Sequence, residues 1–111
     1  MDSENDEAEI RRLNDQLRSR GTGGRITITR GIAALGADMI VKIMLAVVSF
    51  DAFTTDNDPY KEHDCAIIEV DGVKVLWKID YYDLAFAGRS PDPADPDLTL
   101  RLLTVMLAEE Y

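Results

Sequence analysis

The first twenty residues are polar except for one narrow apolar stripe. Ile10, Leu13 and Leu17 lie three and four positions apart, which is the spacing of one face of a helix. Acidic residues come first in this segment and arginines last, an order that suits the helix dipole. The stripe is too thin to hold an isolated helix, so the segment either docks on the remaining chain or frays. A Gly-Thr-Gly-Gly break at residues 21–24 follows it.

The next two segments show the patterns of a strand and of a helix. Residues 25–30 alternate isoleucine with threonine, and these β-branched residues predict a half-buried strand. Residues 37 to about 53 have the length and composition of a helix, which we expect to be the buried centre of the fold. Its apolar stripe consists of Ile40, Ile43, Met44 and Val47, widened by Met39, Ala46 and Phe50.

Residues 64–79 predict a β-hairpin with a defined register. Asp71-Gly72 is a type I′ turn signal between two apolar runs. A two-residue loop pairs Val70 with Val73, Ile68 with Val75, Ala66 with Trp77 and Asp64 with Ile79, and these pairs share the core face. The opposite face pairs Glu69 with Lys74, Ile67 with Leu76 and Cys65 with Lys78. We expect that second face to be partly exposed or to meet another surface.

A proline-rich acidic loop precedes the last predicted element. Three prolines within residues 90–97 exclude a helix or central strand there. Asp95 is placed to be the N-cap of a helix with Pro96 at its first position. Leucines, a valine and a methionine then predict a helix to about residue 109, with one face made of Leu98, Leu102, Val105 and Met106.

This order of elements predicts the fold class α+β. We expect a small antiparallel sheet, formed by strand 25–30 and hairpin 65–79, packed by two helices. Residues 1–21 form a helical or flexible arm, and residues 22–111 form a single domain.

Composition limits the class of protein. The chain has 111 residues, 21 acids and 12 bases, and a net charge of -9, which excludes a conventional basic nucleic-acid binder. Its longest apolar run, residues 39–50, is shorter than the ~20 residues of a membrane span. One cysteine and the lack of a signal peptide predict a cytoplasmic protein. Residues 1–50 carry seven acids and seven bases, so the whole net charge lies in residues 51–111.

The open end of the hairpin collects residues with candidate chemistry. If Asp64 faces Ile79, then His63 lies beside Asp80 and Glu62 lies near Tyr81. His63 is then either an acid/base group assisted by Glu62, Asp64 and Asp80, or a structural residue that pins the hairpin. The structural or recognition role is favoured.

The sequence predicts neither a metal site nor a cofactor. A lone histidine does not predict a zinc site. The acids around Asp56 lack the spacing and the glycine of a calcium loop. No P-loop, dinucleotide-binding, nucleophile-elbow or zinc-protease motif is present. Cys65 is expected to be a packed strand residue rather than a nucleophile.

Tyrosines amid carboxylates predict a surface for a basic partner, because tyrosine is enriched in binding hot spots and opposite charges attract across interfaces. An alternative is that the acids only maintain solubility. The residues we assign to partner binding are Asp58, Tyr60, Glu62, His63, Asp80, Tyr81, Tyr82, Asp83, Asp92 and Asp95.

Five motifs in residues 22–111 resemble a bacterial family of unknown function that is common on plasmids and other mobile elements. They are Thr22-Gly23-Gly24-Arg25, residues 57–64 (NDPYKEHD), residues 77–83 (WKIDYYD), residues 90–96 (SPDPADP) and residues 103–111 (LTVMLAEEY). Lys61 and Cys65 depart from the glycine and aromatic residues expected of that family. The resemblance implies no activity, catalytic residue or cofactor. It suggests a mobile-element context, in which small acidic proteins often inhibit host defence, as anti-CRISPR proteins do.

We therefore expect a non-enzymatic interaction protein that inhibits a host nucleic-acid-handling or defence complex, with mimicry of DNA charge as one mechanism. Its partner is a protein with a basic surface, and neither nucleic acid nor membrane is bound directly. One alternative is a small hydrolase or nuclease centred on His63. Another is a homodimer that pairs through the outer hairpin face at Ile67 and Leu76.

Overall fold

The computed structural model of the protein describes residues 3–111, so the first two residues of the predicted arm lie outside it. The fold is α+β, as the sequence predicts. The elements are α1 (Ser3–Arg20), β1 (Arg25–Ile28), α2 (Arg30–Ala33), α3 (Ala37–Val48), β2 (Cys65–Val70), β3 (Val73–Tyr82), η1 (Pro96–Leu98), β4 (Leu100–Leu107) and η2 (Ala108–Glu110). None of the helices among the described residues is long and apolar enough to cross a membrane.

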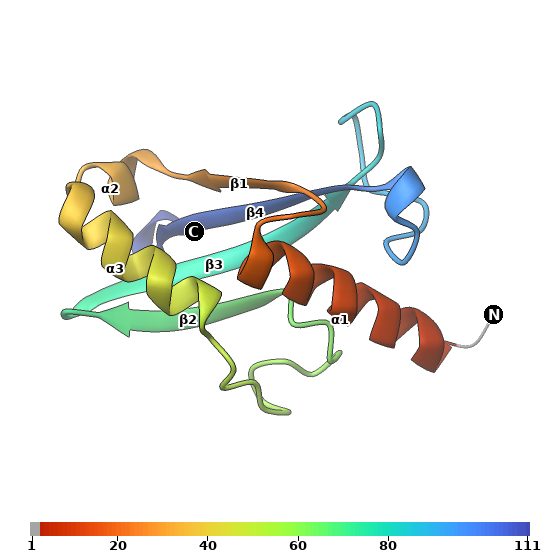
Figure 1. The fold of residues 1–111 in the computed structure, drawn as a ribbon, viewed down its shortest axis with the longest axis horizontal. Helices are drawn as coiled ribbons and strands as arrows, with labels where there is room; N and C mark the ends of the chain where they lie inside the picture. The colour runs from red at the N-terminus through yellow and green to blue at the C-terminus, as the bar shows by residue number, and fades with distance from the viewer. Residues whose placement is uncertain (1–2) are drawn as a thin grey trace.

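The four strands form one mixed sheet in the order β1-β4-β3-β2. β1 runs parallel to β4, whereas the β2–β3 and β3–β4 pairs are antiparallel. The predicted sheet was wholly antiparallel and lacked β4, so both points are corrected. Helices α1 and α3 lie on the same face of this sheet, which gives two layers (Figure 1).

The hairpin has the predicted register. Val70 pairs with Val73, Ile68 with Val75 and Ala66 with Trp77. The Ile79 N–H donates to the Asp64 carbonyl at 2.7 Å, which extends this register by one pair. A two-residue turn leaves only one alignment of the strands that buries the apolar face, and this explains why the sequence was sufficient.

The predicted C-terminal helix is wrong, because residues 100–107 form strand β4 between β1 and β3. Leucines at many positions satisfy helical and strand periods equally. In the strand, Leu103 and Val105 face the core with no exposed surface, and Met106 is on the opposite face. The predicted N-cap is confirmed, because Asp95 Oδ1 accepts the Asp97 N–H at 2.9 Å. The helix that it caps is the single turn η1.

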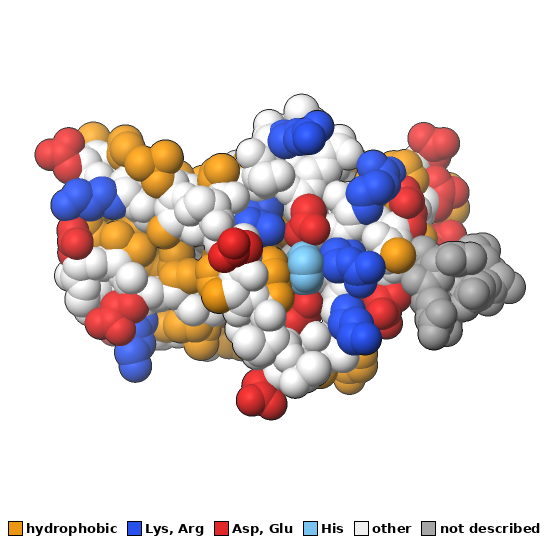
Figure 2. Space-filling view, turned by 60° about the horizontal axis from the view of Figure 1, so that its bottom comes forward, with side chains coloured by type: hydrophobic (Ala, Val, Ile, Leu, Met, Phe, Trp, Pro, Cys, Tyr) orange, Lys and Arg blue, Asp and Glu red, His pale blue; other side chains and the backbone are white. Residues whose placement is uncertain are grey.

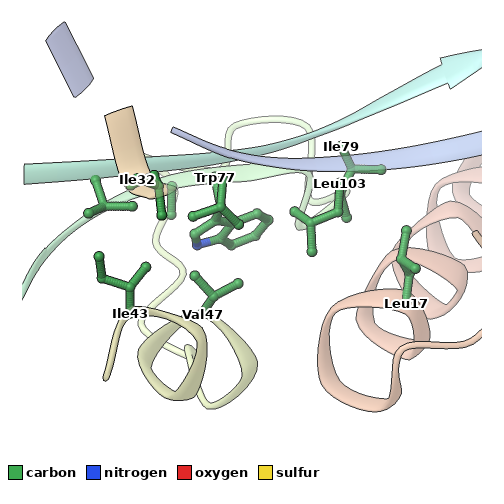
Figure 3. Close-up of a cluster of buried hydrophobic side chains, with 10 residues drawn as sticks. Leu17, Ile32, Ile43, Val47, Trp77, Ile79 and Leu103 are labelled. Carbon is green, nitrogen blue, oxygen red and sulfur yellow. The ribbon is translucent and has the colours of Figure 1, made fainter. Parts of the chain in front are cut away.

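Trp77 lies at the centre of the core, between the sheet and α3 (Figure 3). Helix α3 contributes Ile43 and Val47, which are fully buried. The sequence predicted a helix at the buried centre of the fold that reached about residue 53. The helix instead ends at Val48, and Leu45 on its outer face is 64% exposed, because only one side of α3 meets the sheet.

Helix α1 docks on the body through apolar and polar contacts. Leu17 is fully buried in the core cluster. The buried Arg18 guanidinium donates from Nη1 to the carbonyls of Val47 (3.1 Å), Val48 (3.3 Å) and Phe50 (2.8 Å). Val47 and Val48 are the last two residues of α3 and Phe50 follows shortly after, so the guanidinium lies at the helix C-terminus, where the helix dipole favours a positive charge. Through Arg18, the docked α1 therefore supplies hydrogen-bond donors to carbonyls at the C-terminus of α3.

Candidate functional site: an acidic cleft lined by tyrosines

A cleft of about 610 Å³ opens beside β3, just before the first residue of β2. Its size is that of a site for an organic ligand or a side chain of a partner. Five of the ten residues predicted to bind a partner line this cleft, namely Tyr60, Glu62, Asp80, Tyr81 and Tyr82. The other lining residues are Asp64, Ile79, Gly88 and Arg89.

Backbone geometry creates the gap. Asp64 is the last residue to pair with β3 on this side, and Lys61 and His63 both have positive φ, 56° and 55°, which turns the preceding chain away. Further along β3, the backbone of Arg89 pairs with that of Tyr82 in an isolated antiparallel β-bridge. The edge of β3 between these two pairings therefore forms the floor of the cleft.

A hydrogen-bonded network fixes one wall of the cleft. The Tyr81 hydroxyl donates to Glu62 Oε1 at 2.9 Å, which confirms the predicted proximity of these two residues. Asn14 of α1 donates from Nδ2 to the same hydroxyl at 2.7 Å and to the Glu62 carbonyl at 3.0 Å. Arg101 of β4 donates from Nε to Asn14 Oδ1 at 2.9 Å. Four segments of the chain thus hold Glu62 and Tyr81 in place.

Two of the three carboxyl groups in the cleft, those of Glu62 and Asp64, are partly buried. Partial burial raises the pKa of Glu62 although the Tyr81 hydroxyl donates to it. Burial also raises the pKa of Asp64, and the negative charges of Asp58 and Asp80 add to the effect. Each shift means that the ionised carboxylate is less stable here than in water. A cation placed in the cleft would stabilise both.

Asp80 and Tyr82 form the part of the cleft nearest the outer face of the sheet. Asp80 forms an ion pair with Lys78 two residues away. Tyr82 stacks on Phe86 with ring centroids 4.5 Å apart. Tyr60, on the opposite rim, is 74% exposed. Exposed aromatic rings beside carboxylates are typical of sites that bind an organic cation.

His63 does not take part in this cleft. Its Nδ1 lies 2.8 Å from Asp15 Oδ1 of α1, and its Nε2 lies 3.5 Å from Asp58 Oδ2. The imidazole ring stacks on the Phe53 ring, with the two ring centroids 3.7 Å apart. The predicted pairing of His63 with Asp80 is therefore wrong, because α1, whose docking the sequence left open, supplies the partner. Figure 2 shows the histidine at the surface, with acidic and basic side chains around it.

The remaining predicted residues are used within the chain. Asp58 is 5% exposed, and its Oδ1 accepts the His63 N–H at 3.1 Å. Asp83 Oδ1 accepts the Ala87 N–H at 2.9 Å. In the proline-rich loop, Asp92 Oδ1 accepts the Ala94 N–H at 3.1 Å, and Asp95 caps η1. These carboxylates hold turns outside the cleft.

Sequence reasoning missed several residues of the site. Asp64 was assigned only to the acid/base alternative, although the hairpin register already placed it at the open end. Arg89 and Asn14 gave no sequence signal, because a loop bridge and a docked helix bring them there. Arg101 was missed because β4 was predicted as a helix, and strand alternation places it on the same face as Tyr81.

No group of three or more histidine, cysteine, aspartate or glutamate side chains is arranged to hold a metal ion among the side chains that the structure describes, those of residues 6–111. Comparison with curated proteins and with solved structures finds no match. A family model described as "Protein of unknown function (DUF3768)" matches residues 28–110. This range contains every lining residue of the cleft but not α1. Because it covers most of the chain, the protein belongs to this family of unknown function.

Proposed function

We propose that the protein is a non-enzymatic interaction module whose acidic cleft receives a basic side chain of a partner protein. The observation that carries this proposal is the cleft of about 610 Å³ that three carboxylates and three tyrosines line. Tyrosines supply contact area and the attraction of an aromatic face for a cation. The carboxylates supply charge complementarity.

The electrostatics of the cleft support a cationic ligand, although Arg89 also lines the cleft and its charge offsets part of the rise that burial causes in the pKa of Glu62. Glu62 and Asp64 have raised pKa values because burial disfavours their ionised forms. A guanidinium or ammonium group would compensate that cost and would receive charge-assisted hydrogen bonds. A neutral or anionic ligand would leave the cost in place.

For the partner, we propose a protein of a host nucleic-acid-handling or defence complex, met in the cytoplasm, with inhibition in the manner of an anti-CRISPR protein as the biological outcome. Such complexes present basic grooves to nucleic acid. Recognition through one cleft is better supported than mimicry of a whole phosphate backbone, because Asp58, Asp92 and Asp95 hold local structure.

The acid/base alternative centred on His63 has less support. Both ring nitrogens of His63 face carboxylate oxygens of the chain itself. A general base needs a ring nitrogen within hydrogen-bond reach of the substrate. The residues that this alternative groups with His63, namely Glu62, Asp64 and Asp80, line the cleft, which His63 does not.

The proposal is tested by titrating the isotope-labelled protein with acetyl-arginine-amide and following backbone amide shifts. Acetyl-citrulline-amide is the control ligand, since it has nearly the same shape without the charge. We expect a Kd of about 1 mM, an affinity of about 4 kcal/mol, with the largest shifts at residues 79–82 and 88–89, and no saturable shifts with citrulline.

Matched variants locate the binding. The double variant Tyr60→Ala, Asp64→Asn removes one aromatic ring and one charge from the cleft and should abolish the shifts. Asp56→Asn, Tyr111→Ala makes the same chemical changes at exposed positions that do not line the cleft, and should bind as the unmodified chain does. Equal binding of arginine and citrulline, or unchanged binding by the cleft variant, would overturn the proposal.

A further inference from the structure

Strand β2 is one of the two edges of the sheet, and it is the longer one. β2 has six residues, whereas the other edge strand, β1, has four. Figure 1 shows β2 outermost, with β3 on one side only. Its sequence, Cys-Ala-Ile-Ile-Glu-Val, contains no lysine, proline or glycine. Natural edge strands usually carry such residues to prevent pairing with another chain.

The register shows which backbone groups of this edge are free. The Asp64 carbonyl accepts the Ile79 N–H, so even-numbered residues of β2 direct their N–H and C=O groups toward β3. The alternate residues, Cys65, Ile67 and Glu69, direct theirs outward. No hydrogen bond engages those outward groups from the described backbone of residues 3–111 or the described side chains of residues 6–111. The Ile67 side chain is also 64% exposed.

This free edge adjoins the acidic cleft. Asp64 immediately precedes β2 and lines the cleft together with Glu62. The chain before it turns away at His63, whose φ is 55°. A strand that lies along β2 and continues past Asp64 therefore reaches the end of the sheet at which the cleft opens. One partner segment could use both features.

We propose that β2 pairs with an extended segment of the partner, which places an apolar side chain beside Ile67 and a basic side chain in the cleft. This inference rests on the proposed function and adds the mode of binding. Main-chain hydrogen bonds to Cys65, Ile67 and Glu69 supply affinity, and the cleft supplies selectivity for arginine or lysine. The bound sheet has five strands.

Charge complementarity favours this occupant over a second copy of the chain. Two copies paired antiparallel about Ile67 would align Asp64 of one with Val70 of the other, and would bring the Asp71 turn to the cleft. Asp71 is acidic and already bound to Lys42. The turn itself carries no basic residue, since Lys42 is paired with Asp71 and Lys74 lies on β3, one strand away from the paired edge.

The test uses the synthetic peptide acetyl-Arg-Thr-Val-Thr-Val-Thr-Arg-amide, which has an arginine at each end and so serves either strand direction. Titration of the full chain should give a Kd at least tenfold lower than that of acetyl-arginine-amide. The same peptide with N-methyl groups on alternate residues, which removes N–H donors on one edge, should lose this gain. The doubly citrulline-substituted peptide should bind more weakly than the arginine peptide.

A variant of the edge provides an independent measurement. Ile67→Pro removes an outward N–H that makes no bond within the sheet, and proline is tolerated at such edge positions. This variant should bind acetyl-arginine-amide normally but lose the gain shown by the peptide. Ile67→Val, which keeps the N–H and a β-branched side chain, should retain most of it. Circular dichroism checks the fold, and the N-methyl peptides test the same bond if the proline variant unfolds.

The outcomes separate the two proposals. A peptide that binds no more tightly than acetyl-arginine-amide overturns strand pairing and leaves the cleft proposal standing. Equal binding by N-methylated and unmodified peptides does the same. A dimer in light scattering that Ile67→Pro dissociates assigns the edge to a second copy and overturns the inference. Failure of both ligands to bind overturns the inference and the proposed function together.

Discussion

Asn14 Nδ2 lies 2.7 Å from the Tyr81 hydroxyl and joins a helix outside the matched family region to a strand inside it. Asn14 is fully buried and also bonds the Glu62 carbonyl and Arg101 Nε. One amide side chain therefore holds the wall of the cleft.

Asn14→Ala should lower the free energy of unfolding by about 2–3 kcal/mol. The change removes the acceptor of the buried Arg101 Nε and the donor to the Tyr81 hydroxyl. An unsatisfied buried group costs about 1–3 kcal/mol. Urea unfolding followed by Trp77 fluorescence measures the effect. Gln16→Ala, on the partly exposed side of the same helix, should stay within about 0.5 kcal/mol of the unmodified chain. Equal effects of both changes would contradict the network.

Removal of residues 1–21 should abolish cooperative unfolding of the remaining chain. The deletion uncovers the core beside Leu17 and removes Arg18 from the carbonyls at the C-terminus of α3. Amide chemical-shift dispersion and the urea transition report the loss. A synthetic peptide of residues 1–21 should restore both when added. A shortened chain with an unchanged transition would show that α1 is dispensable for folding.

Gly24→Ala should destabilise the protein by about 1–3 kcal/mol, the usual cost of overpacking. A Cβ at this position would lie 2.7 Å from the Arg101 carbonyl oxygen and 2.9 Å from Leu17 Cδ2. The backbone of β4 has no room to move, since β4 pairs on both sides. At Gly88 the nearest atom would be 3.7 Å away, so Gly88→Ala should be nearly neutral. Thermal unfolding of the two variants makes the comparison.

Asp64→Asn should stabilise the protein at pH 7, and the difference should vanish at acidic pH. Burial raises the pKa of Asp64 in the folded chain, so ionised Asp64 costs stability above that pKa. Below the ordinary value of 3.8 both states are protonated and the cost is gone. Unfolding free energies of variant and unmodified chain between pH 7 and pH 3.5 test this.

Glu110→Gln should change the free energy of unfolding at pH 7 in the opposite direction from Asp64→Asn. Hydrogen bonds from the Thr29 hydroxyl and from the Leu107 and Gly31 N–H groups lower the pKa of Glu110. Its stabilisation is present above the ordinary pKa and is lost as the pH falls through the folded value. The variant should therefore be less stable at pH 7, with a difference that shrinks in acid. Curves of the same sign for the two variants would refute these assignments.

Local rules were sufficient where the information was local. The Asp71-Gly72 turn and the two alternating strands specify the hairpin register, and that register alone places Glu62 near Tyr81. Asp95 is a cap in the structure because an N-cap depends only on the next few residues. The α+β class follows from the mixture of strand and helix patterns.

Local rules failed where distant segments compete. Residues 100–107 have an apolar pattern that fits a helix, but as a strand they pair with both β1 and β3. Arg101 then faces inward beside Tyr81, a position that a helix prediction could not reveal. His63 lies in sequence next to the acidic end of the hairpin, yet it pairs with Asp15, 48 residues away.

The sequence by itself determined the hairpin, the Asp95 N-cap, the fold class and the types of residue that meet at the end of β3, because each depends on short-range backbone preferences. Only the tertiary structure decided which carboxylates remain available. Docking of α1 provides hydrogen-bond partners for His63 and Tyr81. Turns in the proline-rich loop engage the carboxylates of Asp92 and Asp95. Because β2 begins only at Cys65, a cleft opens in front of Asp64. These outcomes depend on burial and pairing between segments far apart in the chain, which no local pattern encodes.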